Sequence, residues 1–109
     1  MNVQPLFNLM VEKKASDLFM TCYAPVKLKI DGKIIPVNKL ELTPKMVWQA
    51  ATELMNEQQL EELNRDLEID FAVSKSGIGR FRVNVFHQRG NLALVMRHIA
   101  QSVPELDEL

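Results

Sequence analysis

Apolar residues recur at helical spacing in three parts of the chain, and each part predicts a helix. The first covers residues 4–14. The second starts at Thr43 and Pro44, a pair typical of a helix N-terminus, and an apolar stripe at i, i+3, i+4, i+7 and i+8 follows. Asn56 followed by Gln59 resembles a capping box, which predicts a further helix directly after it.

Elsewhere apolar and polar residues alternate with a period of two, which predicts strands. Asp31-Gly32 is the strongest hairpin signal in the sequence. Pro36 cannot donate a ladder hydrogen bond, so its strand should lie at an edge or close to its own end. The predicted strands are residues 18–22, 26–30, 33–37, 67–74, 79–87 and 92–99. This order of elements predicts an α+β domain with an antiparallel sheet of about six strands and helices on one face.

The pairing of the last strands can be inferred from their faces, because a slip of one residue turns every side chain over. A tight loop at residues 88–91 then places Arg82 opposite Arg97, on the face away from the aliphatic residues. For the preceding hairpin we expect the turn at residues 75–77, which places Asp70 opposite Arg82.

Arg80, Arg82 and Arg97 are therefore expected to gather on one face of the sheet, with Asp70 offsetting one of their charges. Like charges that face each other in a sheet cost a few tenths of a kcal/mol up to about 1 kcal/mol. One interpretation is a solvated face whose arginine stems cover apolar surface. The other is an anion site, because a guanidinium fork fits phosphate oxygens and a strand holds it rigidly.

Composition and charge narrow the classes of function. The 109 residues make one domain, and 13 basic against 14 acidic residues give a net charge of −1, which argues against a nucleic-acid partner. A single cysteine, Cys22, excludes a disulfide within the chain and suits the cytoplasm. No Cys/His ligand spacing predicts a metal site, and no apolar run is long enough to span a bilayer.

The sequence offers no complete catalytic apparatus. It contains no GxxxxGK[ST] phosphate loop, and the short GxG of Gly77 and Gly79 joins two strands without opening a helix. Ser16 and Asp17 are adjacent, and we expect them to point to opposite faces, as neighbouring strand residues do. We therefore expect no catalytic residue and no autonomous enzyme activity in these 109 residues.

Several segments resemble, in order, the N-terminal domain of the type IV pilus retraction ATPases, the PilT/PilU family of secretion-type hexameric motors. They cover essentially the whole chain, and ASDL and GIGRFRVN are the most specific. Phe19, where many members have His, and QRGN at 88–91 resemble the PilU branch more than the PilT branch. The segments are KKASDLFMT (13–21), IDGKIIPV (30–37), MNEQQLEEL (55–63), EIDFAVS (68–74), GIGRFRVNVFHQR (77–89) and VPELDEL (103–109).

The resemblance implies a PAS-like N-terminal domain at residues 1–103 and, at 104–109, the start of a linker to an absent RecA-like ATPase core. The Walker and other nucleotide motifs of that core do not occur in this sequence, so we expect a fragment of a larger motor. In the family, the matching arginines face the nucleotide cleft between the two domains. The resemblance thus implies that Arg80, Arg82 and Arg97 contact ATP phosphates and couple hydrolysis to domain motion.

The resemblance also implies cofactors, partners and a location. The full-length protein would use ATP and Mg, and the fragment alone neither. Its partners would be its own C-terminal ATPase domain, neighbouring subunits of a homo-hexamer, the pilus inner-membrane platform protein and a paralogous retraction ATPase. It would work in twitching motility, in the cytoplasm at the inner face of the inner membrane. A stand-alone PAS-like sensor or binding module is the alternative, and a ligand-dependent rise in melting temperature would favour it.

Overall fold

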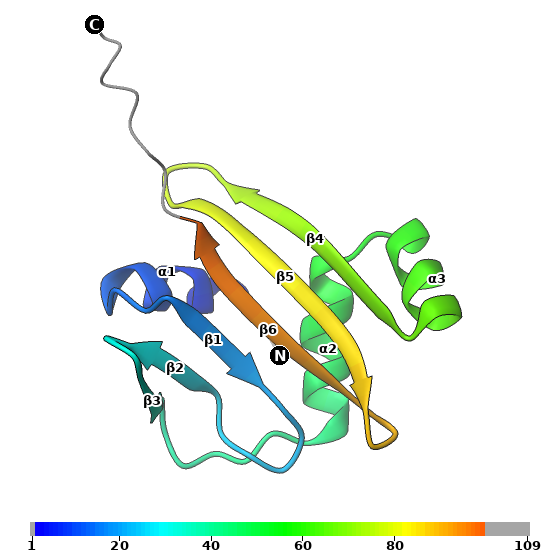
Figure 1. Ribbon diagram of the computed structural model, residues 1–109, viewed down its shortest axis with the longest axis horizontal. Helices are drawn as coiled ribbons and strands as arrows, with labels where there is room; N and C mark the ends of the chain where they lie inside the picture. Colours follow the sequence, from blue (N-terminus) through cyan, green and yellow to red (C-terminus); the bar gives the residue numbers. More distant parts are fainter. Residues whose placement is uncertain (1, 100–109) are drawn as a thin grey trace, which may run out of the picture.

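The computed structural model describes residues 2–99, which form one six-stranded sheet and three helices (Figure 1). The helices are Gln4–Glu12 (α1), Pro44–Leu54 (α2) and Glu57–Asp66 (α3). The strands are Asp17–Met20 (β1), Lys27–Ile30 (β2), Lys33–Pro36 (β3), Glu68–Lys75 (β4), Gly79–Gln88 (β5) and Asn91–Ile99 (β6). The predicted α+β class is confirmed, with every predicted element present. The expected linker at 104–109 lies outside the described residues.

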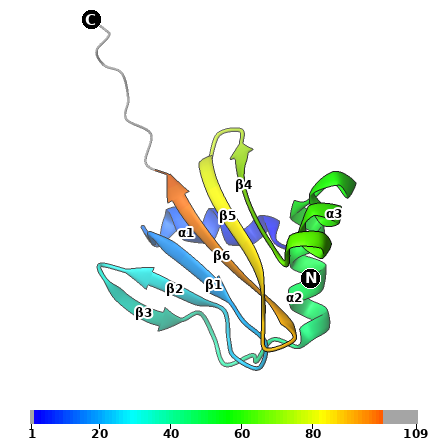
Figure 2. The same cartoon turned by 45° about the vertical axis from the view of Figure 1, so that its right-hand side comes forward.

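The sheet consists of two three-stranded meanders that meet in its middle. Its strand order is β3-β2-β1-β6-β5-β4, and the neighbouring pairs are antiparallel. Hairpins join the strands within each meander. The pairing of β1 with β6, in contrast, joins two strands that are far apart in the sequence (Figures 1 and 2). There Asp17 lies opposite Arg97 and Leu18 opposite Met96. The integrity of the sheet therefore depends on one long-range pairing.

The register of the β5–β6 hairpin is as predicted, and that of the β4–β5 hairpin is not. Arg82 lies opposite Arg97, which confirms the first prediction. Asp70 lies opposite Asn84, so its predicted position opposite Arg82 is wrong by two residues. The turn is centred on Gly77, whose φ of 77° suits glycine, and not one residue earlier. A shift of two residues keeps every side chain on its face, so the apolar pattern could not detect it.

The predicted caps begin both later helices. The Thr43 hydroxyl accepts a hydrogen bond from the Met46 backbone N–H at 3.2 Å, and Pro44 follows at the first helical position. Asn56 and Gln59 exchange bonds of 2.8 and 3.0 Å in a capping box. These side chains satisfy backbone donors that the first turn of a helix leaves unpaired, so local sequence sets where α2 and α3 start.

The core lies between the sheet and the helices α1 and α2, which Figure 2 shows behind it. Phe7 of α1 and Phe81 of β5 are both fully buried, and their rings meet edge to face with centroids 4.7 Å apart. The sheet contributes the side chains of alternate residues, among them Leu18, Val83 and Met96.

Among the described residues, no helix is long and apolar enough to cross a membrane.

We expect Phe81→Ala to lower the free energy of unfolding by about 3–5 kcal/mol, because it leaves a cavity beneath Phe7. Urea unfolding at pH 7 measures this loss. Trp48→Ala is the control, because the Trp48 side chain is 42% exposed and its removal should cost less than about 1 kcal/mol. Equal losses in the two variants would contradict this view of the core.

Candidate functional site

The predicted arginines lie on the sheet face opposite α1 and α2, which we call the open face. Arg80 and Arg82 alternate along β5, and Arg97 lies on β6 directly across from Arg82. All three residues are exposed. Asp17 of β1 and Asp70 of β4 have side chains on the same face, according to the strand register. The structure therefore brings Arg82 and Arg97 together, places Arg80 on the same face nearer the end of the hairpin, and adds two carboxylates to that face.

Arg97 is bound to a buried carboxylate. Its Nε donates to Asp17 Oδ1 at 3.0 Å, across the central β1–β6 pairing. The Asp17 side chain is only 7% exposed, whereas that of Arg97 is 69% exposed. The Ser16 hydroxyl donates to the second oxygen, Oδ2, at 2.8 Å. The expectation that Ser16 and Asp17 point apart is wrong, because Ser16 precedes β1 and strand alternation does not apply to it.

The environment of Asp17 favours its charged form. Burial raises the pKa of this carboxyl, but hydrogen bonds from Arg97 and Ser16 and the positive charges of Arg97 and Lys29 lower it. The lowering effects prevail, so the pKa of Asp17 lies below its ordinary value of 3.8. Asp17 is therefore ionised at neutral pH and provides a fixed negative charge next to Arg97.

Arg82 is also bound to a carboxylate, but this ion pair is much more exposed to solvent. Its Nη2 donates to Asp70 Oδ2 at 3.0 Å, and the two side chains are 60% and 49% exposed. Because the register offsets the two residues, this contact is diagonal between neighbouring strands. The residue opposite Asp70, Asn84, donates through Nδ2 to the Ile69 carbonyl at 3.2 Å. An exposed pair of this kind contributes at most about 1 kcal/mol.

Both guanidinium groups keep free donors. Arg82 uses only Nη2 and Arg97 only Nε, and their other N–H groups have no partner among the described residues. Within the same range Arg80 takes part in no ion pair. A hollow of 150 Å³ lies between Arg82 and Arg97 and is lined by Asp70, Arg82, Asn84, Val95 and Arg97. Arg80 does not line it and lies instead at a separate hollow by the β4–β5 turn. Two guanidinium forks around one hollow can bind an oxyanion such as phosphate.

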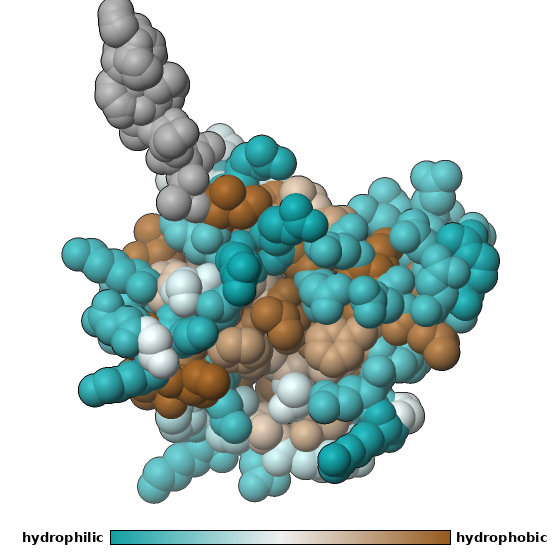
Figure 3. Space-filling model, viewed as in Figure 1, coloured by the Kyte–Doolittle hydropathy of each residue, from teal (hydrophilic) through white to brown (hydrophobic). Residues whose placement is uncertain are grey.

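Figure 3 shows the open face as a patch of apolar surface in the middle of the sheet, with hydrophilic side chains around it. Half-buried Phe19, Phe86 and Val95 belong to this face by register. Charged groups at the border of an apolar surface are less hydrated than groups on a fully polar surface. Their interaction with an anion is therefore stronger than in open water.

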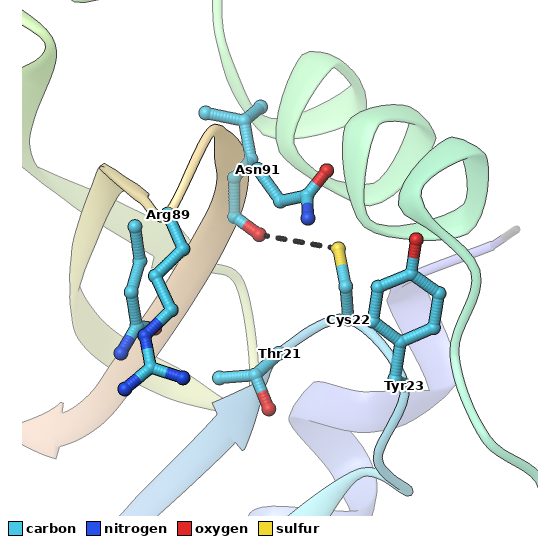
Figure 4. Close-up of a pocket in the computed structure, with 7 residues that line it drawn as sticks. Thr21, Cys22, Tyr23, Arg89 and Asn91 are labelled. Atoms are coloured by element: carbon cyan, nitrogen blue, oxygen red, sulfur yellow. Dashed lines mark hydrogen bonds between the residues drawn. The ribbon is translucent and has the colours of Figure 1, made fainter.

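A second hollow, of 390 Å³, lies where β1 ends next to the β5–β6 turn (Figure 4). The Cys22 thiol donates weakly to the Leu92 carbonyl at 3.6 Å, and burial raises its pKa, so the reactive thiolate is disfavoured. Arg89 lies in the turn, at the opposite end of β5 from Arg80.

Within residues 2–99, no group of three His, Cys, Asp or Glu could hold a metal ion.

Known proteins match the chain from end to end. It is 42% identical over 109 residues to the type IV pilus ATPase PilU of Pseudomonas aeruginosa, and 31% identical over 109 residues to the type IV pilus retraction ATPase PilT of that organism. The crystal structure of the pilus retraction motor PilT with bound ADP matches the whole chain at a TM-score of 0.88 and 30% identity. No family model matches the chain.

The chain spans 28% of the length of PilU and 32% of the length of PilT, and it covers 32% of the matched PilT structure. Its identity with PilU exceeds its identity with PilT, in agreement with the branch predicted from Phe19 and the QRGN segment. The matches support both the fold and the N-terminal domain predicted by the sequence motifs.

We expect acid to destabilise the protein through Asp17. Because folding lowers the pKa of Asp17, its contribution is present above the unfolded value near 3.8 and is lost as the pH falls through the lower, folded value. Asp17→Asn should reduce this pH dependence and lower the free energy of unfolding at pH 7 by about 1–3 kcal/mol. Urea unfolding at a series of pH values measures both effects.

Asp66→Asn is the matched control. Arg65 lowers the pKa of Asp66, but both side chains are exposed on α3, where solvent screens the pair. This variant should change the pH dependence much less than Asp17→Asn does, because solvent screens the pair. An Asp17→Asn variant with the pH dependence of the wild type would show that Asp17 does not stabilise the fold through its charge.

Proposed function

Because the chain belongs to the PilT/PilU family and matches its N-terminal domain, we propose that it serves in a hexameric type IV pilus retraction ATPase. In that motor its open face contacts the phosphates of ATP at the cleft between two domains. The single observation that carries this proposal is the cross-strand pair of Arg82 and Arg97, with Arg80 beside it. Domain closure over the nucleotide would then follow the hydrolysis cycle.

The arginine pair is a feature that stability alone does not favour. Two like charges directly opposite each other in a sheet repel, and each carboxylate partner occupies only one nitrogen of its arginine. A triphosphate carries several negative charges, and it would relieve the repulsion while it accepts bonds from the free nitrogens. Such arginines stabilise the charge that develops on a transferred phosphoryl group.

The ligands, partners and location that we propose for the motor rest on its family. ATP and Mg would be held by the RecA-like core, and the chain would contact that core and neighbouring subunits of a homo-hexamer. The matched PilT structure has ADP bound, which supports a nucleotide as the ligand. The assembly would act in twitching motility, in the cytoplasm at the inner face of the inner membrane, with the pilus platform protein and a paralogous retraction ATPase.

The alternative, a stand-alone sensor, requires space for a ligand inside the domain. Fully buried side chains, among them Phe7, Leu18 and Phe81, fill the layer between helices and sheet. This packing favours the motor domain over the sensor.

In the complete protein, we expect Arg82→Ala and Arg97→Ala each to lower ATP turnover by about tenfold or more, because each removes a donor to the transferred phosphate. A steady-state phosphate-release assay measures the rate. Arg65→Ala is the control: Arg65 is an exposed arginine on α3, paired with Asp66, and its loss should leave turnover unchanged. Wild-type turnover in Arg82→Ala, with the fold intact, would contradict the proposal.

We also expect the native protein to be roughly three to four times as long as this chain, because the chain covers 28% of PilU and 32% of PilT. An antibody raised against the domain, used on a lysate of the source organism, reads this size directly. A native band at 12.5 kDa would mean that the domain acts alone and would favour the sensor.

A further inference from the structure

We propose that the two facing arginines have different roles, which their carboxylate partners determine. Asp17 positions Arg97 as a fixed donor, whereas Asp70 holds Arg82 only while no anion is bound and competes with the anion for it. This inference rests on the proposed anion site and describes how that site is regulated. It follows from the contrast between a buried pair and an exposed pair on the same face.

Arg97 cannot easily leave Asp17. The carboxylate is 7% exposed, and its two oxygens are bonded to Arg97 Nε at 3.0 Å and to the Ser16 hydroxyl at 2.8 Å. If Arg97 moved away, the buried Asp17 carboxylate would lose its only ion-pair partner among residues 2–99, at a large cost in free energy. The bond through Nε also leaves both terminal nitrogens of the guanidinium without a partner among the described residues. Asp17 therefore fixes the arginine and leaves its terminal nitrogens free for an anion.

Arg82 can exchange its partner at little cost. Its single bond to Asp70 joins two half-exposed side chains, and water can replace either of them. Asp70 makes no other hydrogen bond or ion pair with the described residues. While the site is empty, Asp70 screens the repulsion between Arg82 and Arg97, which face each other. An arriving phosphate would replace Asp70 at Arg82, because it offers more charge and more acceptor oxygens.

The two roles predict opposite effects of two similar substitutions. Asp70→Asn removes the competitor and should strengthen anion binding. Asp17→Asn also removes a negative charge from the open face, but it releases Arg97 and should weaken binding. A purely electrostatic effect would strengthen binding in both variants, so the sign of the Asp17→Asn effect identifies positioning.

The test uses inorganic tripolyphosphate as the probe, titrated into this 109-residue chain. The side-chain Nε–H signals of Arg82 and Arg97 are followed by nuclear magnetic resonance. We expect Asp70→Asn to lower the apparent Kd about two- to fivefold, the range that an exposed ion pair supports. We expect Asp17→Asn to raise it about threefold or more and to abolish the distinct Arg97 Nε–H signal, which Asp70→Asn should preserve.

Glu68→Gln is the matched control for charge alone. Glu68 is exposed on the open face of β4, two residues before Asp70, and it forms no ion pair with the described residues. Glu68→Gln should strengthen the binding of tripolyphosphate less than Asp70→Asn does. If Asp17→Asn does not fold, Ser16→Ala removes only the hydroxyl that orients the carboxylate, and it should weaken binding in the same direction.

Two results would overturn the proposal, and they differ in meaning. If Asp17→Asn folds and tightens binding as Asp70→Asn does, both carboxylates act only through charge, and the division of roles is wrong. If neither Arg82→Ala nor Arg97→Ala changes the affinity for tripolyphosphate, the anion site itself is wrong, and the proposed function loses its support.

Discussion

The pairing of β1 with β6 is the interaction on which the rest of the structure depends. Each meander is built from hairpins, but only this pairing joins the first strand to the last and unites the two halves of the sheet. Closing a loop of this length has an entropic cost that must be offset before the contact stabilises anything. The Asp17–Arg97 bond lies on this pairing and favours a single register, because a slipped strand would bury the carboxylate without its partner.

The same constraint also builds the candidate site. The helices α1 and α2 cover one face of the sheet and leave the other uncovered, so charged side chains can gather there without being buried. The central pairing then brings Arg97 next to Arg82, which arrives from the neighbouring hairpin. Arg97 is thus part of the structural connection between the two halves and of the proposed anion site. Stability and the proposed function are therefore linked at this residue.

The features that could be predicted from the sequence depend on residues that are close together along the chain. Thr43 and Asn56 marked helix starts through caps that need only a few residues, and the β5–β6 register followed from apolar alternation across a tight loop. The β4–β5 register was wrong by two residues because such a shift preserves the faces. The bond between Asp17 and Arg97 was missed for a different reason. Its partners are 80 residues apart, and no local pattern shows that β1 lies beside β6 or that Asp17 is buried.

The most direct test of the account is a structure of the complete protein with a non-hydrolysable ATP analogue. The account predicts guanidinium nitrogens of Arg82 and Arg97 at about 3 Å from phosphate oxygens. It also predicts that Arg97 is still bound to Asp17 and that Arg82 has left Asp70. A nucleotide bound away from the open face, with both arginines still paired only to their carboxylates, would contradict it.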